Sequence, residues 1–307
     1  MPTRKPRALK PGDTIRIVTP GSPIAAGWMA AGIAQLEAAG FIVEMAEHAF
    51  DSAGYVAADP ATRAADLQGA FMDPNVDAVF CSRGGYGCSH LVPVLDFDAI
   101  AAQRKIFLGF SDITVLHLAL NRRGLPTLYG PMPATLGPER EPWVLESLLG
   151  ALHGTASAPM EAPAATTVVG GSAEGVVTGG TLCLLADAIG TAEPLDAEGK
   201  IVLIEDVDED SYRVDAMLTH LVQAGSLRGA VGIVVGEMTR TDERPPGSTG
   251  SRPWRDVVAD ILAPLGLPMV LDFPFGHCKN MLSMPLGIRA HLDAERGTVT
   301  YLESLCE

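Results

Sequence analysis

The chain has few cysteines, and their placement excludes two common kinds of small-domain stabilisation. Five occur among its 307 residues: Cys81, Cys88, Cys183, Cys278 and Cys306. An odd, scattered set does not fit a disulfide framework and suits a reducing compartment with free thiols. No CxxC pair and no His/Cys cluster at zinc-ligand spacing is present, so we expect no structural metal.

Basic residues and long apolar runs are also scarce. The chain has 22 Lys and Arg against 37 Asp and Glu, a formal net charge of −15. Such a field repels phosphate backbones, so we expect no nucleic-acid partner. No run of about 18 apolar residues occurs, which predicts no membrane span. The basic residues 1–18 lack the apolar core of a secretory signal.

The first half alternates short apolar runs with helical patterns. Strands are predicted at 14–20, 41–47, 76–82 and 106–110, and helices at 28–40, 61–73, 90–95 and 112–120. Alternating strands and helices imply parallel βαβ units with both faces of the sheet covered. We therefore predict an N-terminal parallel-sheet α/β domain over residues 1–150.

Residues 151–170 are rich in Ala, Pro, Thr and Gly without periodicity, which predicts a linker. A second α/β domain is then predicted over residues 171–307. Its expected elements are strands at 200–204, 230–238 and 268–272, helices at 211–225 and 254–262, a loop at 239–252 and a hairpin at 288–303.

Three polar residues follow predicted strands, where parallel α/β sheets place functional groups. Ser111 follows IFLGF, Glu205 follows KIVLI, and His277 follows MVLDFPFG. A hydroxyl nucleophile needs a base, and the base needs a third group to orient it. Each residue also has an ordinary interpretation: a helix cap, a solvated acidic turn and a packed histidine. Asp112, beside Ser111, equally suits a cap of the same turn.

A glycine-rich segment, Arg83-Gly84-Gly85-Tyr86-Gly87, ends the third predicted strand. Closely spaced glycines let backbone amides turn toward one point and stabilise an oxyanion. The alternative is a tight turn that closes a strand. No GxGxxG follows a first strand, so a nicotinamide site has little support. A Gly-x-Ser-x-Gly elbow is absent too, because Ile113 stands where its last glycine would be.

The motifs in order resemble one known family. They are LKPGDTIRIVTPGSP, CSRGGYG, GFSDITVLHLAL, YGPM, VTGGTLCLL, IVLIEDVDE and FPFGHCKNMLSMPLG, and they extend over nearly the whole chain. On these motifs the sequence is similar to the LD-carboxypeptidases, serine peptidases that include murein tetrapeptide carboxypeptidases and microcin C self-immunity proteins.

The resemblance implies a Ser-Glu-His triad of Ser111, Glu205 and His277. It implies an oxyanion hole from the backbone amides of Gly85 and Asp112. It further implies an active site at the interface of the two domains, a cytoplasmic homodimer, and no metal or other cofactor. The expected reaction releases the terminal D-Ala from murein tetrapeptide during peptidoglycan recycling.

Four further residues are candidates for binding the small peptide substrate. Arg83 could pair with a substrate carboxylate or form a structural ion pair, and Tyr86 could line the substrate groove or pack at the edge of the core. Thr181 stands where many relatives have Asn after paired glycines, which puts substrate detail in doubt. Trp254 is the candidate for stacking on a nucleobase.

Two alternatives to murein cleavage stay open. One is an enzyme of the microcin-immunity type, which would hydrolyse aminoacyl- or peptidyl-nucleotide amides. The other is a non-catalytic, two-domain ligand-binding protein. The presence of Ser, Glu and His at the matching positions speaks against the second alternative.

Overall fold

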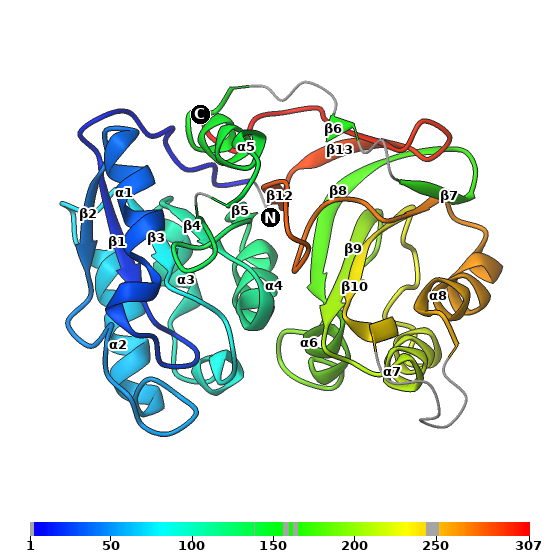
Figure 1. The fold of residues 1–307 in the computed structure, drawn as a ribbon, viewed down its shortest axis with the longest axis horizontal. Coiled ribbons are helices and arrows are strands. Elements are labelled where there is room, and N and C mark those ends of the chain that lie inside the picture. The colour runs from blue at the N-terminus through cyan, green and yellow to red at the C-terminus, as the bar shows by residue number, and fades with distance from the viewer. Residues whose placement is uncertain (1–2, 138, 156–159, 162–164, 244–251) are drawn as a thin grey trace. The chain divides into compact units, whose positions relative to one another are not determined.

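Two sheets form the framework of the chain (Figure 1). The computed structural model describes residues 3–137, 139–155, 160–161, 165–243 and 252–307. One compact unit comprises Met1–Ala156, Leu282–Gly287 and Ser304–Glu307, and the other comprises Ser157–Met281 and Ile288–Glu303. Both units are α/β with mixed sheets. The domain boundaries expected from the sequence stay a prediction.

The first unit contains a six-stranded sheet of order β12-β5-β4-β3-β1-β2. Its strands are β1 (Thr14–Val18), β2 (Ile42–Met45), β3 (Ala78–Cys81), β4 (Ile106–Gly109), β5 (Thr127–Tyr129) and β12 (Met284–Leu286). All neighbours pair in parallel except β12, which is antiparallel to β5. Every residue of β3 and β4 is buried, as expected for central strands covered on both faces.

Helices and 3₁₀ turns connect these strands. They are η1 (Ala26–Trp28), α1 (Ala30–Ala38), α2 (Pro60–Met72), η2 (Cys88–Leu91), α3 (Phe97–Ala102), η3 (Ser111–Ile113), α4 (Thr114–Arg122) and α5 (Pro142–Leu152). The helix expected at 90–95 is wrong: a 3₁₀ turn ends at Leu91. Pro93 explains the early end, because proline removes a donor and clashes inside a helix.

The second unit contains an eight-stranded sheet of order β6-β14-β13-β8-β9-β10-β11-β7. Its strands are β6 (Met160–Glu161), β7 (Thr166–Val169), β8 (Ser172–Thr181), β9 (Lys200–Val207), β10 (Gly232–Thr239), β11 (Met269–Leu271), β13 (Arg289–Asp293) and β14 (Thr298–Tyr301). The run β8-β9-β10-β11 is parallel, and the remaining strands pair antiparallel. The predicted terminal hairpin is confirmed as β13–β14.

The helices of the second unit are α6 (Leu182–Asp187), α7 (Ser211–Gln223), η4 (Thr241–Glu243), α8 (Trp254–Leu262) and η5 (Ala263–Leu265). The amphipathic pattern expected for α7 is confirmed, since its buried residues are Val214, Met217, Leu218 and Leu221. The segment expected as a linker contains the end of α5 and both edge strands of the eight-stranded sheet, β6 and β7. Its residues 156–159 and 162–164, and residues 244–251 of the expected 239–252 loop, lie outside the described residues.

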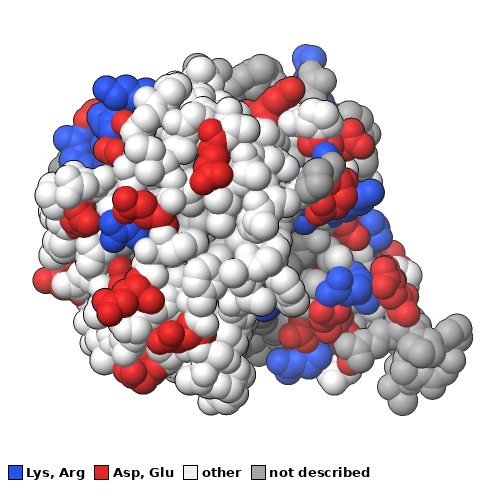
Figure 2. All heavy atoms as spheres, turned by 60° about the vertical axis from the view of Figure 1, so that its left-hand side comes forward, with Lys and Arg blue, Asp and Glu red and all other residues white. Residues whose placement is uncertain are grey.

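The excess of acidic over basic residues in the sequence is visible on the surface (Figure 2). On the face that Figure 2 shows, Asp and Glu side chains are scattered among uncharged ones, with Lys and Arg beside some of them. Among the helices of the described ranges, none combines the length and apolar character needed to cross a bilayer. The absence of a nucleic-acid partner stays a prediction.

Candidate active site

Ser111 lies at a strained turn between β4 and α4. Its φ is +67°, in the left-handed region that few residues other than glycine adopt. Such strain persists only where surrounding contacts impose it, and it concentrates at functional sites. The Gly-x-Ser-x-Gly motif is absent, yet the serine occupies a sharp strand-to-helix turn of the kind that exposes a nucleophile.

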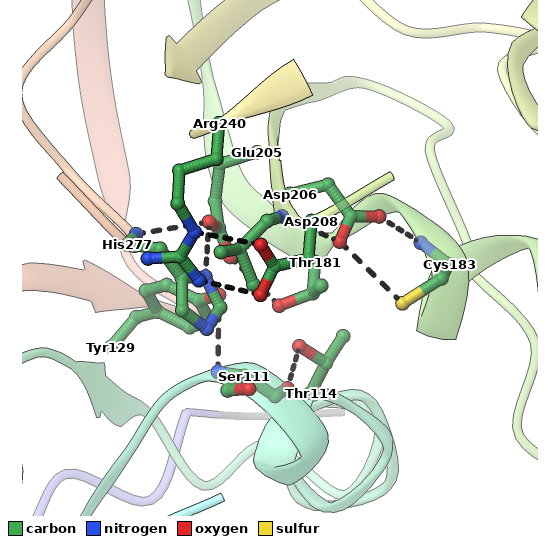
Figure 3. Close-up of polar contacts among 11 residues, drawn as sticks. Ser111, Thr114, Tyr129, Thr181, Cys183, Glu205, Asp206, Asp208, Arg240 and His277 are labelled. Carbon is green, nitrogen blue, oxygen red and sulfur yellow. Dashed lines mark hydrogen bonds and ion pairs between the residues drawn. The ribbon is translucent and has the colours of Figure 1, made fainter. Parts of the chain in front are cut away.

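Two side chains bind the backbone of Ser111 on either side (Figure 3). The Ser111 N–H donates to the Tyr129 hydroxyl over 3.3 Å, and Thr114 Oγ1 donates to the Ser111 carbonyl over 2.7 Å. Tyr129 is fully buried, and its ring contacts those of Phe110 and His117. The sequence interpretation gave neither residue a role, although both lie within the motifs GFSDIT and YGPM.

The glycine segment approaches Ser111 closely. A Cβ atom at Gly84 would lie 2.7 Å from Ser111 Cβ and 2.9 Å from its Oγ. Gly85 has a φ of +103°, and a Cβ there would lie 2.3 Å from Ser22 Oγ. Both positions therefore require glycine. The amides of Gly85 and Asp112 as oxyanion donors stay a prediction.

The Asp112 carboxylate joins η2, which directly follows the glycine segment, to the Ser111 turn. Its Oδ2 accepts the backbone N–H of Cys88 over 2.9 Å. The cap expected for Asp112 on its own turn is wrong, because neither η3 nor α4 has a side-chain cap bond. The side chain reaches instead to the first residue of η2. Burial raises the pKa of this carboxyl, and the bonds from Cys88 act in the opposite direction.

Arg63 of α2 forms hydrogen bonds to three loops around the Ser111 turn. Its guanidinium is buried and donates to the carbonyls of Pro20, Ala58 and Gly87. These bonds use Nε and Nη1, Nη2 lies 3.4 Å from His90 Nδ1, and together these contacts hold the loops against one another. The sequence interpretation missed this residue; its signal is a charge on the face of a helical pattern that also carries Leu67 and Phe71.

The second unit holds a histidine–carboxylate pair (Figure 3). Glu205 Oε2 accepts from His277 Nδ1 over 2.7 Å and from the His277 backbone N–H over 3.1 Å. Glu205 is fully buried. Gly276, with a φ of +86°, makes the approach possible, because a Cβ there would lie 2.3 Å from Glu205 Cγ. The pair has the geometry of a base and its orienting group.

Thr181 also binds Glu205. Its hydroxyl donates to Oε1 over 2.7 Å, so its one donor is spent on the carboxylate. Contact between Thr181 and a substrate, expected from the sequence, would have to use the oxygen lone pairs and stays a prediction. The observed bond makes Thr181 a positioning residue for the pair.

Neighbouring charges set the protonation of this pair. Burial alone would lower the pKa of His277, but the charge and hydrogen bond of Glu205, with the charge of Asp206, raise it above its ordinary value. Asp206 accepts the backbone N–H groups of Cys183 and Val207. Its burial, and then the neighbouring charge of Glu205, raise the pKa of Asp206 to about 7.

The other candidates lie in different surroundings. Arg83 Nη1 donates to the Pro23 carbonyl over 3.4 Å, and its guanidinium lies 5.8 Å from the centre of the Trp28 ring. Tyr86 is 52% exposed and contacts the ring of Tyr55 edge-on. Both lie in or beside the glycine segment, and their contact with a substrate stays a prediction.

Trp254, the candidate for nucleobase stacking, is only 2% exposed. It begins α8, and the guanidinium of Arg255 lies 4.3 Å from the centre of its ring. A ring buried to this degree offers no open face for a base to stack on. The preceding segment 244–251 lies outside the described residues.

Comparison with known proteins agrees with these features. The LD-carboxypeptidase N-terminal domain matches residues 15–130, and the LD-carboxypeptidase C-terminal domain matches residues 174–292. A Streptomyces coelicolor chain named as a carboxypeptidase is 40% identical over 305 residues, covering 96% of this chain and 95% of its own. The murein tetrapeptide carboxypeptidase of Pseudomonas aeruginosa is 32% identical, covering 92% and 94%.

Among solved structures, MccF in complex with glutamyl sulfamoyl guanosine has a TM-score of 0.88 at 22% identity, covering 99% of each chain. This likeness concerns the fold. The family matches together define a carboxypeptidase of the serine-peptidase class. More narrowly, the chain belongs to the LD-carboxypeptidase family, and the resemblance inferred from its motifs is confirmed.

The contact between Gly84 and Ser111 leads to a first prediction. Gly84→Ala should lower carboxypeptidase activity about 100-fold, because the methyl group forces the glycine segment and Ser111 apart by a fraction of an ångström or more. Peptide turnover and labelling by a fluorophosphonate probe measure the effect. Gly69→Ala is the matched control, since nothing lies within 4 Å of its Cβ position. Equal activity of both variants would contradict the assigned contact.

Proposed function

We propose that the protein is a serine LD-carboxypeptidase that releases the terminal D-Ala from murein tetrapeptide. The observation that carries the proposal is the strained Ser111 turn in one unit together with the Glu205–His277 pair in the other, at the positions where the family has its triad. The named activity of the Pseudomonas aeruginosa relative supports the substrate.

In this mechanism Ser111 Oγ attacks the carbonyl carbon of the scissile amide. His277 accepts the hydroxyl proton through Nε2, because its Nδ1 is bonded to Glu205. Glu205 orients the imidazole and balances its positive charge. The tetrahedral oxyanion binds the amides of Gly85 and Asp112, and its collapse expels D-Ala, whose amine takes the proton from His277. Water then hydrolyses the acyl-enzyme ester by the same route.

Other substrates and roles are less well supported. Cleavage of an aminoacyl-nucleotide amide would call for a surface on which the base can stack, and the burial of Trp254 removes the residue suggested for it. A binding protein without catalysis would not explain the strained backbone of Ser111 or the buried Glu205–His277 bond. Cytoplasmic location, a homodimer and the absence of a metal stay predictions of the family resemblance.

The test of the proposed function is direct. Incubation of purified protein with murein tetrapeptide should yield the tripeptide and free D-Ala, detected by mass spectrometry. Ser111→Ala should reduce the rate by more than about a thousandfold, because the nucleophile is lost. Ser52→Ala, which changes an exposed serine of the same unit, should leave the rate unchanged. Cleavage by Ser111→Ala at the native rate would rule out the assigned nucleophile.

The charge of Asp206 leads to a prediction on pH dependence. Catalysis needs neutral His277, so kcat/KM should fall as the pH drops through the pKa of this histidine. Asp206→Asn removes a negative charge that raises this pKa, an effect that is largest near and above pH 7, where Asp206 is ionised. The acidic limb of the profile should therefore move to lower pH.

Asp196→Asn is the control for this measurement, because it removes an exposed carboxylate that precedes the opposite end of β9. Its acidic limb should stay where the wild-type limb is. A shift of the Asp206→Asn limb to higher pH would contradict the electrostatic assignment.

A further inference from the structure

Two neighbouring strands of the second sheet end in a bidentate ion pair (Figure 3). Asp208 follows β9 and Arg240 follows β10, and the two strands are parallel. Arg240 Nε lies 2.7 Å from Asp208 Oδ1, and Nη2 lies 2.5 Å from Oδ2. The pair therefore lies at the carboxyl edge of the sheet, where α/β folds bind ligands.

The backbone at both positions is strained. Asp208 and Arg240 each have a φ of +63°, in the left-handed region that Asp adopts more readily than Arg. Their side chains are 64% and 50% exposed, and ion pairs exposed to this degree contribute little to stability. The ion pair therefore contributes a fixed orientation of the guanidinium more than it contributes stability.

The orientation of the guanidinium leaves a second binding edge. Asp208 occupies the edge formed by Nε and Nη2. The other edge, Nη1 with the second hydrogen of Nη2, matches the two oxygens of a carboxylate in the same planar way. Because Asp208 fixes the plane, little side-chain freedom remains to be lost when a ligand binds.

Arg240 also lies close to His277. The charge of Arg240 lowers the pKa of His277, against the effect of Glu205, so the two side chains lie within electrostatic range at the same edge of the second sheet (Figure 3). In the proposed reaction His277 delivers a proton to the amine of the leaving amino acid. A single Cα atom separates that amine from the terminal carboxylate. A cation beside the imidazole is therefore well placed for this carboxylate.

We propose that Arg240, held in orientation by Asp208, binds the C-terminal carboxylate of the substrate and so restricts cleavage to the last residue. This proposal rests on the proposed function. The ligand class is the α-carboxylate of the leaving amino acid. Arg83, which the sequence suggested for a substrate carboxylate, lies in the other unit and is the rival candidate.

The experiment compares murein tetrapeptide with the same peptide bearing a C-terminal amide. Wild-type protein should prefer the acid by about 10- to 100-fold in kcat/KM, the value of a charge-assisted bidentate bond. Arg240→Gln should lose most of this preference and, at a pH above the acidic limb of its profile, keep its activity on the amide. The preference of Arg240→Lys for the acid should lie between those of wild type and Arg240→Gln, because Lys keeps the charge but cannot form the bidentate bond.

Arg255→Gln is the matched control. Arg255 forms an equivalent bidentate pair with Asp272, in the same unit and at the end of β11, with distances of 2.9 and 2.5 Å. Its loss should leave the preference for the acid intact, and thermal unfolding should show all variants folded. If Arg83→Gln abolishes the preference and Arg240→Gln does not, the proposal is overturned.

A binding measurement separates this inference from the proposed function. Calorimetry with Ser111→Ala, which cannot form the acyl-enzyme, compares affinity for the acid and the amide without turnover. Tighter binding of the acid that disappears in Ser111→Ala/Arg240→Gln supports the inference even if wild type cleaves no tetrapeptide. Equal affinity for acid and amide, or weak binding of both, overturns it, while tetrapeptide cleavage by wild type would still uphold the proposed function.

Discussion

The left-handed backbone of Ser111 is the constraint on which the first unit's site depends. A serine pays a steric penalty in this conformation, and the surrounding contacts have to offset it. Tyr129 and Thr114 bind its two peptide groups, Gly84 fits against its side chain, and the neighbouring Asp112 reaches η2. The glycine segment packs so closely against Ser111 that a side chain at Gly84 has no room.

Much of this arrangement could be predicted from the sequence because it follows local rules. Buried strands give continuous apolar runs, and polar residues directly after them are candidates for a site. Ser111, Glu205 and His277 were proposed in this way, and the structure contains the bond between the last two. The edge strand β12 was not predicted, because its pairing with β5 joins residues some 155 positions apart along the chain, for example Met284 and Tyr129.

The supporting residues were harder to predict for a different physical reason. A side chain that acts through a neighbour has no motif of its own; its role depends on where the chain brings it. The sequence predicts Asp112 as a helix cap, yet its carboxylate accepts the backbone N–H of Cys88 in η2. Arg63 reads as a surface charge, yet it is buried among loop carbonyls. Both depend on tertiary contacts that local propensity does not encode.

The carboxyl edge of the second sheet combines opposing charges around one imidazole. Glu205 and Asp206 raise the pKa of His277, and Arg240 lowers it. In the proposed mechanism this imidazole accepts a proton from serine and returns it to an amine, which works best near neutrality, so neither influence should dominate. A substrate carboxylate bound to Arg240 would screen that cation and raise the pKa of His277. The imidazole would then be a stronger base toward Ser111 when the substrate ends in a free carboxylate.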